Sequence, residues 1–202
     1  MKMHSKSSGQ PEQTIAANQP SRAEQDYLKA IHRLGGACQI VSPVAIADRL
    51  QVKPPSVTGM LKRLSDAGWI HYNPGVGARL TTNGMHTARQ VIRRHRLVEL
   101  FLARVLGYDW SEVDAEAEAL EHAVSRRLEQ ALAAYLGEPV EDPHGHPIPT
   151  AEGVFEERRL QPLGVFRSGQ QVLIREAADD DPERLRHWQA QGLERSETMR
   201  FM

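Results

Sequence analysis

The sequence predicts a mainly α-helical protein in which a unit of three helices and a β-hairpin precedes two longer helices. Apolar residues recur three and four positions apart over most of residues 21–136, and glycine or proline interrupts this spacing at short intervals. β-rich stretches at residues 69–72 and 78–81 flank a turn rich in glycine and proline at residues 73–77. The chain of 202 residues is long enough for one or two compact domains.

Capping and turn residues define the first three helices. Ser21 and Glu24 have the spacing of a capping box, and helical spacing of apolar residues continues from there to a glycine pair. A second short helix opens at Ser42, and a third starts near Pro55 and ends at Gly68. Three helices followed by a hairpin predict an N-terminal winged helix-turn-helix.

The second half contains two further helix signals. Asn83 is placed to cap a long helix through about Leu106, and Ser111 is placed to cap another through about Leu136. Residues 138–153, rich in Pro, Gly and His, predict a linker. The expected organisation is a disordered tail (1–20), a winged helix-turn-helix domain (21–90), a helical domain (91–150) and a small β segment (160–202).

Composition indicates an ordinary globular protein of the cytoplasm. The polar N-terminus has no apolar core of a secretory signal, and no apolar run approaches the length of a membrane span. The single cysteine, Cys38, cannot form an internal disulfide, which fits a reducing compartment. We therefore expect a cytoplasmic protein without a membrane partner.

Charge is distributed unevenly along the chain. Residues 21–96 carry 12 Lys and Arg against 4 Asp and Glu, a balance of +8, whereas residues 97–202 carry 11 against 21, a balance of −10. A basic half suggests a polyanionic partner. The alternative is charge drift between domains without a functional meaning.

The basic half favours double-stranded DNA as that partner. The third helix would enter the major groove, where the hydroxyls of Ser56 and Thr58 suit base edges and phosphates. Some winged helices bind proteins instead, but the +8 balance favours DNA, since cations that meet phosphates supply most of the affinity. The candidate DNA-binding residues are Lys53, Pro55, Ser56, Thr58, Lys62, Arg63 and Arg79.

The acidic half carries a second pattern. Glu118, Glu121 and His122 are spaced i, i+3, i+4, and His95 and Glu99 are spaced i, i+4 on the preceding helix. Asp114 lies one turn before Glu118. Two antiparallel helices that oppose such faces form the kind of pocket that holds a metal in helical bundles. The alternative is a solvated charged face.

Six blocks of sequence, taken together, resemble the metal-dependent transcriptional repressors, the family that includes the diphtheria toxin repressor and the manganese transport regulators. The blocks are Gln25–Leu28, Ala45–Leu50, Pro54–Thr58, Arg94–Glu99, Glu118–His122 and Pro143–Pro149. The resemblance implies a homodimer held by its long helices. It also implies that metal binding fits the two winged helices to a palindromic operator and represses metal-uptake genes.

The resemblance also implies two metal sites. The primary site falls on Asp26, Glu118, Glu121 and His122, and the ancillary site falls on His95, Glu99 and Asp114, to which Asp179 or Asp180 could contribute. Asp26 and Glu118 stand where the iron-responsive branch has methionine and cysteine. Hard oxygen ligands favour Mn²⁺, with Fe²⁺ as the alternative.

The chain departs from the family at several positions. Lys29 stands where some manganese regulators have a glutamate, and since a cation cannot ligate, a two-metal centre of that type is not expected. Gly59 replaces a glutamine of the toxin repressor, so operator contacts do not transfer. Residues 160–202 resemble the start of an SH3-like domain without enough strands to close a barrel.

Two other classes of function remain as alternatives. One is a winged-helix regulator without a metal, and the other is a metalloenzyme. The sequence contains no nucleophile motif, phosphate loop or cysteine-based zinc signature. We therefore expect no enzymatic activity and no organic small-molecule substrate.

Overall fold

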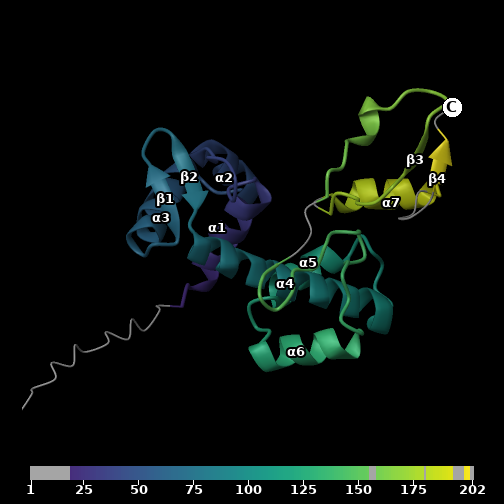
Figure 1. Ribbon diagram of the computed structural model, residues 1–202, viewed down its shortest axis with the longest axis horizontal. Coiled ribbons are helices and arrows are strands. Elements are labelled where there is room, and N and C mark those ends of the chain that lie inside the picture. The colour runs from purple at the N-terminus through teal and green to yellow at the C-terminus, as the bar shows by residue number, and fades with distance from the viewer. Residues whose placement is uncertain (1–18, 155–157, 180, 193–197, 201–202) are drawn as a thin grey trace, which may run out of the picture.

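The computed structural model describes residues 19–154, 158–179, 181–192 and 198–200, so nearly all of the expected tail lies outside the described residues. The chain is mainly helical, which confirms the predicted fold class (Figure 1). The elements in order are α1 (Arg22–Arg33), α2 (Pro43–Leu50), α3 (Pro54–Asp66), β1 (Ile70–Asn73), β2 (Gly77–Leu80), α4 (Thr82–Leu106), α5 (Val113–Leu120), α6 (Arg126–Tyr135), η1 (Leu163–Val165), β3 (Gln171–Leu173), α7 (Pro182–Ala190) and β4 (Thr198–Arg200).

The first five elements form the winged helix-turn-helix. Both halves of the predicted capping box are present at the start of α1, where Glu24 Oε2 accepts from the Ser21 amide at 2.8 Å. β1 and β2 pair as an antiparallel hairpin, and Val41 bridges to Ala78 at its edge. Leu28, Ile46 and Leu61 are fully buried between the helices. This single core fixes the orientation of α1 relative to α3.

Helix α4 connects the winged helix to the second domain (Figure 1). It packs against α1 near its start and against α5 and α6 farther along. Val98 and Leu102 face a small core shared with α5, whereas Leu97 and Leu100 face Ala133 of α6. One helix therefore joins the two domains.

The second half departs from prediction where one helix was expected to run to about Leu136. Helix α5 ends at Leu120, and α6 begins only at Arg126. The Ser125 hydroxyl accepts from the Leu128 amide at 3.2 Å and so caps a new helix. A serine that can hydrogen-bond to the backbone favours a helix start over a helix interior.

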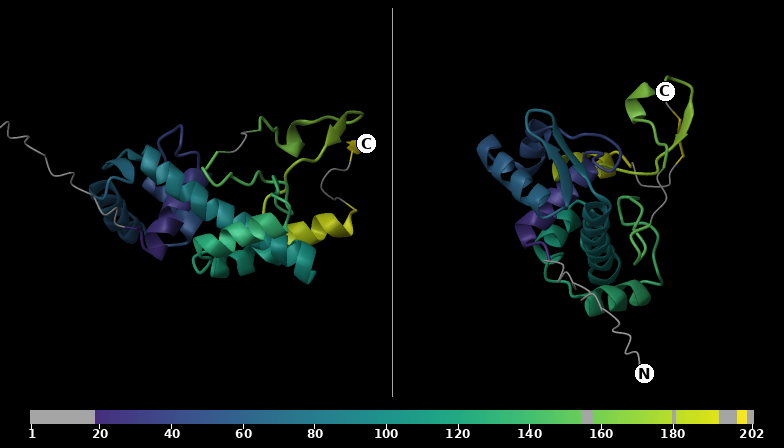
Figure 2. Two further views of the ribbon diagram at one scale, coloured as in Figure 1. Left: turned by 60° about the horizontal axis from the view of Figure 1, so that its bottom comes forward. Right: turned by 60° about the vertical axis from the view of Figure 1, so that its left-hand side comes forward.

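The expected linker is an ordered loop along α4. Arg93 Nη1 donates to the carbonyl of Pro149 at 2.6 Å, and Arg96 Nη1 donates to the carbonyl of Pro147. Beyond the loop, β3 and β4 pair antiparallel, with α7 between them in the sequence (Figure 2). None of the helices within the described residues is both long and apolar enough to cross a membrane.

Candidate metal centre

Helix α1 presents one face to its own domain and another to the second domain. Tyr27, Leu28 and Ile31 are buried in the winged-helix core. Asp26 and Lys29 lie toward α4 and α5, where Lys29 contacts residues 66 to 92 positions away in the sequence. The candidate metal ligands therefore gather at the junction between the two domains.

The first ligand group joins Asp26 to the end of α5. His122 Nε2 lies 2.7 Å from Asp26 Oδ1 and 3.4 Å from Glu121 Oε1. Their ligand atoms lie close enough together to hold one ion. Burial raises the pKa of Asp26, and His122 opposes that effect. Three of the four residues predicted for the primary site meet here.

The fourth residue, Glu118, turns toward Lys29. Lys29 Nζ lies 2.7 Å from Glu118 Oε1 and 2.6 Å from Glu121 Oε2. The ligand atoms of Glu118, Glu121 and His95 form a second compact group. The predicted primary residues thus form two groups that share Glu121.

A third group contains the residues predicted for the ancillary site. His95 Nε2 lies 3.2 Å from Asp114 Oδ1 and 3.5 Å from Glu99 Oε1. Asp179 joins the same group, as anticipated for that segment, whereas Asp180 lies outside the described residues. Burial lowers the pKa of His95, but its close contacts with the Asp114 and Glu121 carboxylates outweigh that effect and raise the pKa to about 10.

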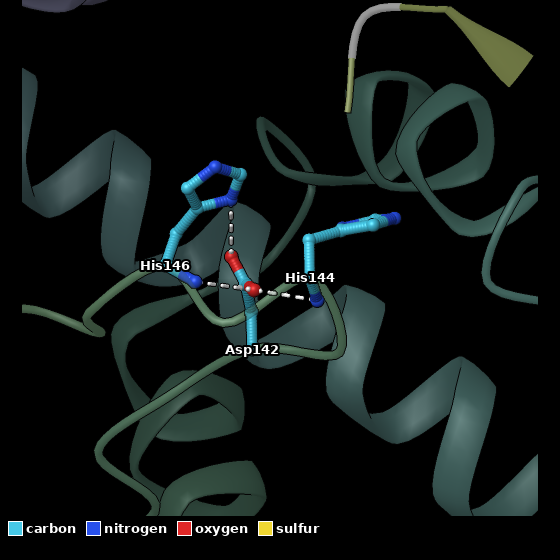
Figure 3. A group of neighbouring side chains, drawn as sticks. All are labelled: Asp142, His144 and His146. Carbon is cyan, nitrogen blue, oxygen red and sulfur yellow. Dashed lines mark hydrogen bonds and ion pairs between the residues drawn. The ribbon is translucent and has the colours of Figure 1, made fainter. Parts of the chain in front are cut away.

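The loop after α6 supplies three candidate ligands that were not predicted from the sequence. Asp142 Oδ1 accepts from the amides of His144 and His146, and His146 Nδ1 lies 3.2 Å from Asp142 Oδ2 (Figure 3). His144 Nδ1 lies 3.4 Å from Glu99 Oε1, so this loop extends the ancillary site. Two signals were present: an alternating Asp-x-His-x-His pattern in a stretch that otherwise predicts a linker, and the resemblance of Pro143–Pro149 to the family.

Many buried polar atoms of these groups have no hydrogen-bond partner, as expected of atoms that would bind a divalent ion. Among the described residues, most buried side-chain atoms without a hydrogen-bond partner gather here, although several lie within ion-pair distance of one another. Buried polar groups are otherwise almost always paired. The unpartnered ligand atoms are His95 Nε2, both oxygens of Glu99, Asp114 Oδ1, Glu121 Oε1, Asp142 Oδ2, His144 Nδ1 and His146 Nδ1.

The candidate DNA-binding residues lie on a different surface. All of them are exposed, and α3 together with the β1–β2 wing carries them (Figure 1). Val57, Met60 and Leu64 turn the opposite face of α3 into the core. Arg79 lies in β2, at the wing. The predicted residues are Lys53, Pro55, Ser56, Thr58, Lys62, Arg63 and Arg79.

Comparison with known families also separates a DNA-binding part of the chain from a metal-binding part. Residues 21–78 match the family described as the iron dependent repressor, N-terminal DNA binding domain. Residues 81–150 match its metal binding and dimerisation domain. The chain belongs to this family of metal-dependent DNA-binding repressors, which are transcriptional regulators and not enzymes.

Individual relatives are about one-third identical to the chain over the residues that align. The iron-dependent repressor IdeR of Mycobacterium leprae is 36% identical over 123 residues, which are 61% of this chain and 54% of IdeR. The chain thus spans about half the length of that relative. An uncharacterized HTH-type transcriptional regulator of Methanocaldococcus jannaschii is 31% identical over 117 residues, which are 57% of this chain and 94% of that protein.

Solved structures extend the similarity to most of the fold. A manganese-dependent transcriptional repressor in complex with manganese superposes with a TM-score of 0.81 at 37% identity, covering 88% of this chain and 82% of that one. The manganese regulator SloR superposes with a TM-score of 0.75 at 30% identity, covering 89% of this chain and 83% of that one.

Proposed function

We propose that the chain is a manganese-responsive, homodimeric repressor that binds a palindromic operator and controls metal-uptake genes. The observation that carries this proposal is the division of one ligand group between two domains. Asp26 belongs to the DNA-binding domain, whereas Glu121 and His122 belong to the domain that follows it.

The split ligand group supplies a physical link between metal and DNA. A bound divalent ion adds the positive charge that holds carboxylates of both domains together. Asp26 contributes only when α1 is docked against α5, so the docked arrangement has the higher metal affinity. A ligand shifts an equilibrium only by such a difference in affinity between states, which is typically about 1–3 kcal/mol.

The ligand chemistry supports manganese. The two groups that share Glu121 offer carboxylate oxygens and imidazole nitrogens without a thiolate, a set that suits Mn²⁺ and also accepts Fe²⁺. Similarity to a repressor solved with manganese favours Mn²⁺, whereas similarity to IdeR favours Fe²⁺. Operator affinity measured against a panel of divalent ions, each held at a buffered free concentration, decides between them.

The operator assay tests the proposal directly. Fluorescence anisotropy with DNA selected from a random pool by the Mn²⁺-loaded protein gives the affinity with and without Mn²⁺. We expect Asp26→Ala to remove most of the metal dependence, which amounts to about 5-fold to 150-fold in affinity for a coupling of this size. Asp48→Ala is the matched control, because Asp48 is an exposed carboxylate of the same domain. It lines the cleft between the two domains that Asp26 also lines.

Two results would contradict the proposal. Operator binding that survives dialysis against a chelator unchanged would favour a winged-helix regulator without a metal. Equal metal dependence in wild type and Asp26→Ala would remove the link through α1.

A further inference from the structure

Lys29 occupies the centre of the second ligand group. Its Nζ lies 2.7 Å from Glu118 Oε1, 2.6 Å from Glu121 Oε2 and 3.2 Å from His95 Nδ1. These three residues are the same ones whose ligand atoms converge closely enough to hold a metal ion. The ammonium therefore stands where a divalent ion bound by this group would stand.

The Lys29 ammonium is buried and paired with carboxylates at this position. Only 5% of the Lys29 side chain is exposed, and the Glu121 side chain is fully buried. An ammonium has three N–H donors, and the carboxylates of Glu118 and Glu121 accept from two of them, while His95 Nδ1 lies 3.2 Å away. A buried charge is tolerated only when it is paired and hydrogen-bonded. Moving the Lys29 ammonium away from these carboxylates would therefore leave buried charges unpaired.

Glu121 connects the ammonium to the first ligand group. Its Oε2 atom faces Lys29, whereas its Oε1 atom lies 3.4 Å from His122 Nε2. One carboxylate thus bridges two neighbouring cation positions, as bridging carboxylates do in centres that hold two metal ions. Here a side chain of the protein fills one of the two positions.

We propose that Lys29 is a built-in cation that replaces a second metal ion, so that the centre formed with Asp26 binds one divalent ion beside a fixed ammonium. The proposal rests on the proposed metal-dependent function and specifies its primary site.

Charge balance gives an independent reason. With His95 neutral, as a metal-ligating imidazole must be, Asp26, Glu118 and Glu121 carry three negative charges and Lys29 leaves two of them unbalanced. A single divalent ion neutralises that remainder. In Lys29→Glu the same site would carry four negative charges, which two divalent ions neutralise. The residue at position 29 therefore sets the number of ions at the centre.

Counting Mn²⁺ in the full-length chain tests the proposal. Equilibrium dialysis with Mn²⁺ as the only divalent ion gives the number bound per chain, and electron paramagnetic resonance detects exchange coupling between two ions bridged by a carboxylate. Lys29→Glu is compared with Lys29→Arg, which keeps the positive charge. Arg22→Glu makes the same charge change at an exposed residue, which lines the same interdomain cleft as Lys29. Ions at the ancillary site are common to all four proteins and cancel in the comparison.

We expect Lys29→Glu to bind one more Mn²⁺ per chain than wild type and to show an exchange-coupled signal. Lys29→Arg and Arg22→Glu should match the wild-type number without such a signal. An unchanged number in folded Lys29→Glu would overturn the proposal. The electron paramagnetic resonance spectrum of the wild type tests the same point without a substitution at position 29. If the wild type shows an exchange-coupled signal that Asp26→Ala abolishes, the centre holds two ions and the proposal is wrong.

The same experiment separates this inference from the proposed function. If Asp26→Ala binds as many ions as wild type, the proposed metal site is wrong. If Asp26→Ala binds one ion fewer than wild type but Lys29→Glu binds no more, the proposed function is retained. In that case only the proposed role of Lys29 is wrong.

Discussion

Two buried imidazoles carry protons that a metal ion would have to displace. Burial lowers the pKa of His95, but close contacts with the Asp114 and Glu121 carboxylates outweigh it and raise the pKa to about 10. Burial lowers the pKa of His144, but contact with Glu99 outweighs it and raises the pKa to about 9. Both side chains are therefore imidazolium cations near neutral pH when no metal is bound, and they balance the carboxylates around them.

We expect metal affinity at the ancillary site to rise with pH. The folded pKa of each histidine lies above its ordinary value of 6.5, so protonation stabilises the metal-free fold fully below pH 6.5. That stabilisation is lost as pH rises through about 9 for His144 and about 10 for His95. Since a ligating imidazole must be neutral, affinity should increase about tenfold per pH unit for each proton displaced.

Competition with a metal-binding dye at pH 6.5, 7.5 and 8.5 measures this dependence. The slope of log affinity against pH should be smaller in His144→Gln, because one proton fewer is displaced. His187→Gln, at an exposed position of α7, should leave this slope unchanged. A slope near zero in wild type would mean that these histidines do not ligate.

The sequence could predict most residues of the site but not their partners. Helical spacing brings Glu118, Glu121 and His122 onto one face, and the resemblance supplies Asp26. Asp142 and His144 escaped prediction because loop residues follow no helical period. The sequence indicated that Lys29 cannot ligate a metal, but not its ion pairs with Glu118 and Glu121, since only the docking of α1 against α5 brings the ammonium among these carboxylates.

At the scale of elements, α3 is the helix best placed to read DNA. Its apolar face is buried and its opposite face is exposed. Gly59 lies on that exposed face, and a Cβ built there meets no atom within 4 Å. Within the protein alone, nothing in its immediate surroundings requires this glycine.

We therefore predict opposite effects of Gly59→Ala on stability and on binding. Alanine should raise the free energy of unfolding by about 0.5–1 kcal/mol, because glycine is costly inside a helix. Operator affinity should fall if α3 lies close against the groove, since the new methyl group points toward the DNA. Thermal unfolding and operator anisotropy measure the two effects.

Gln130→Ala provides the control for Gly59→Ala, because it changes an exposed residue of α6, away from α3. It should leave operator affinity unchanged. If Gly59→Ala also leaves the affinity unchanged, α3 does not approach DNA at this turn.

The elements differ in how well the sequence predicted them. α1 was predicted because its cap and its apolar spacing agree. The break between α5 and α6 was missed because apolar spacing continues through it, and only the Ser125 cap marks the new start. The break ends α5 next to Glu121 and His122, so it also shapes the metal site.

At the scale of the whole molecule, α1 connects three parts of the chain. Asp26 and Lys29 contact the α4–α5 region, and Arg33 Nη2 lies 3.5 Å from Asp179 Oδ2 of the C-terminal segment. Asp179 also belongs to the ancillary ligand group. Both candidate sites therefore contact α1, a helix of the DNA-binding domain.

The proposed homodimer predicts an apolar surface on the second domain, and one is present where α4 ends beside α6. Tyr135 is 69% exposed and Leu106 is 56% exposed. The ring of Tyr135 packs edge-on against Phe101 of α4, with centroids 6.3 Å apart, so apolar side chains of the two helices meet here. Exposed apolar side chains that gather in this way mark protein interfaces.

Tyr135→Glu should dissociate the dimer, because it places a charge in a surface that would otherwise be buried against its copy. Light scattering after size exclusion should then give the mass of one chain. Operator affinity should fall steeply, since two half-sites are no longer bound through one connected protein. Val154→Glu is the control, because Val154 is 62% exposed but lies outside these helices. A Tyr135→Glu protein that remains dimeric with full operator affinity would place the interface elsewhere.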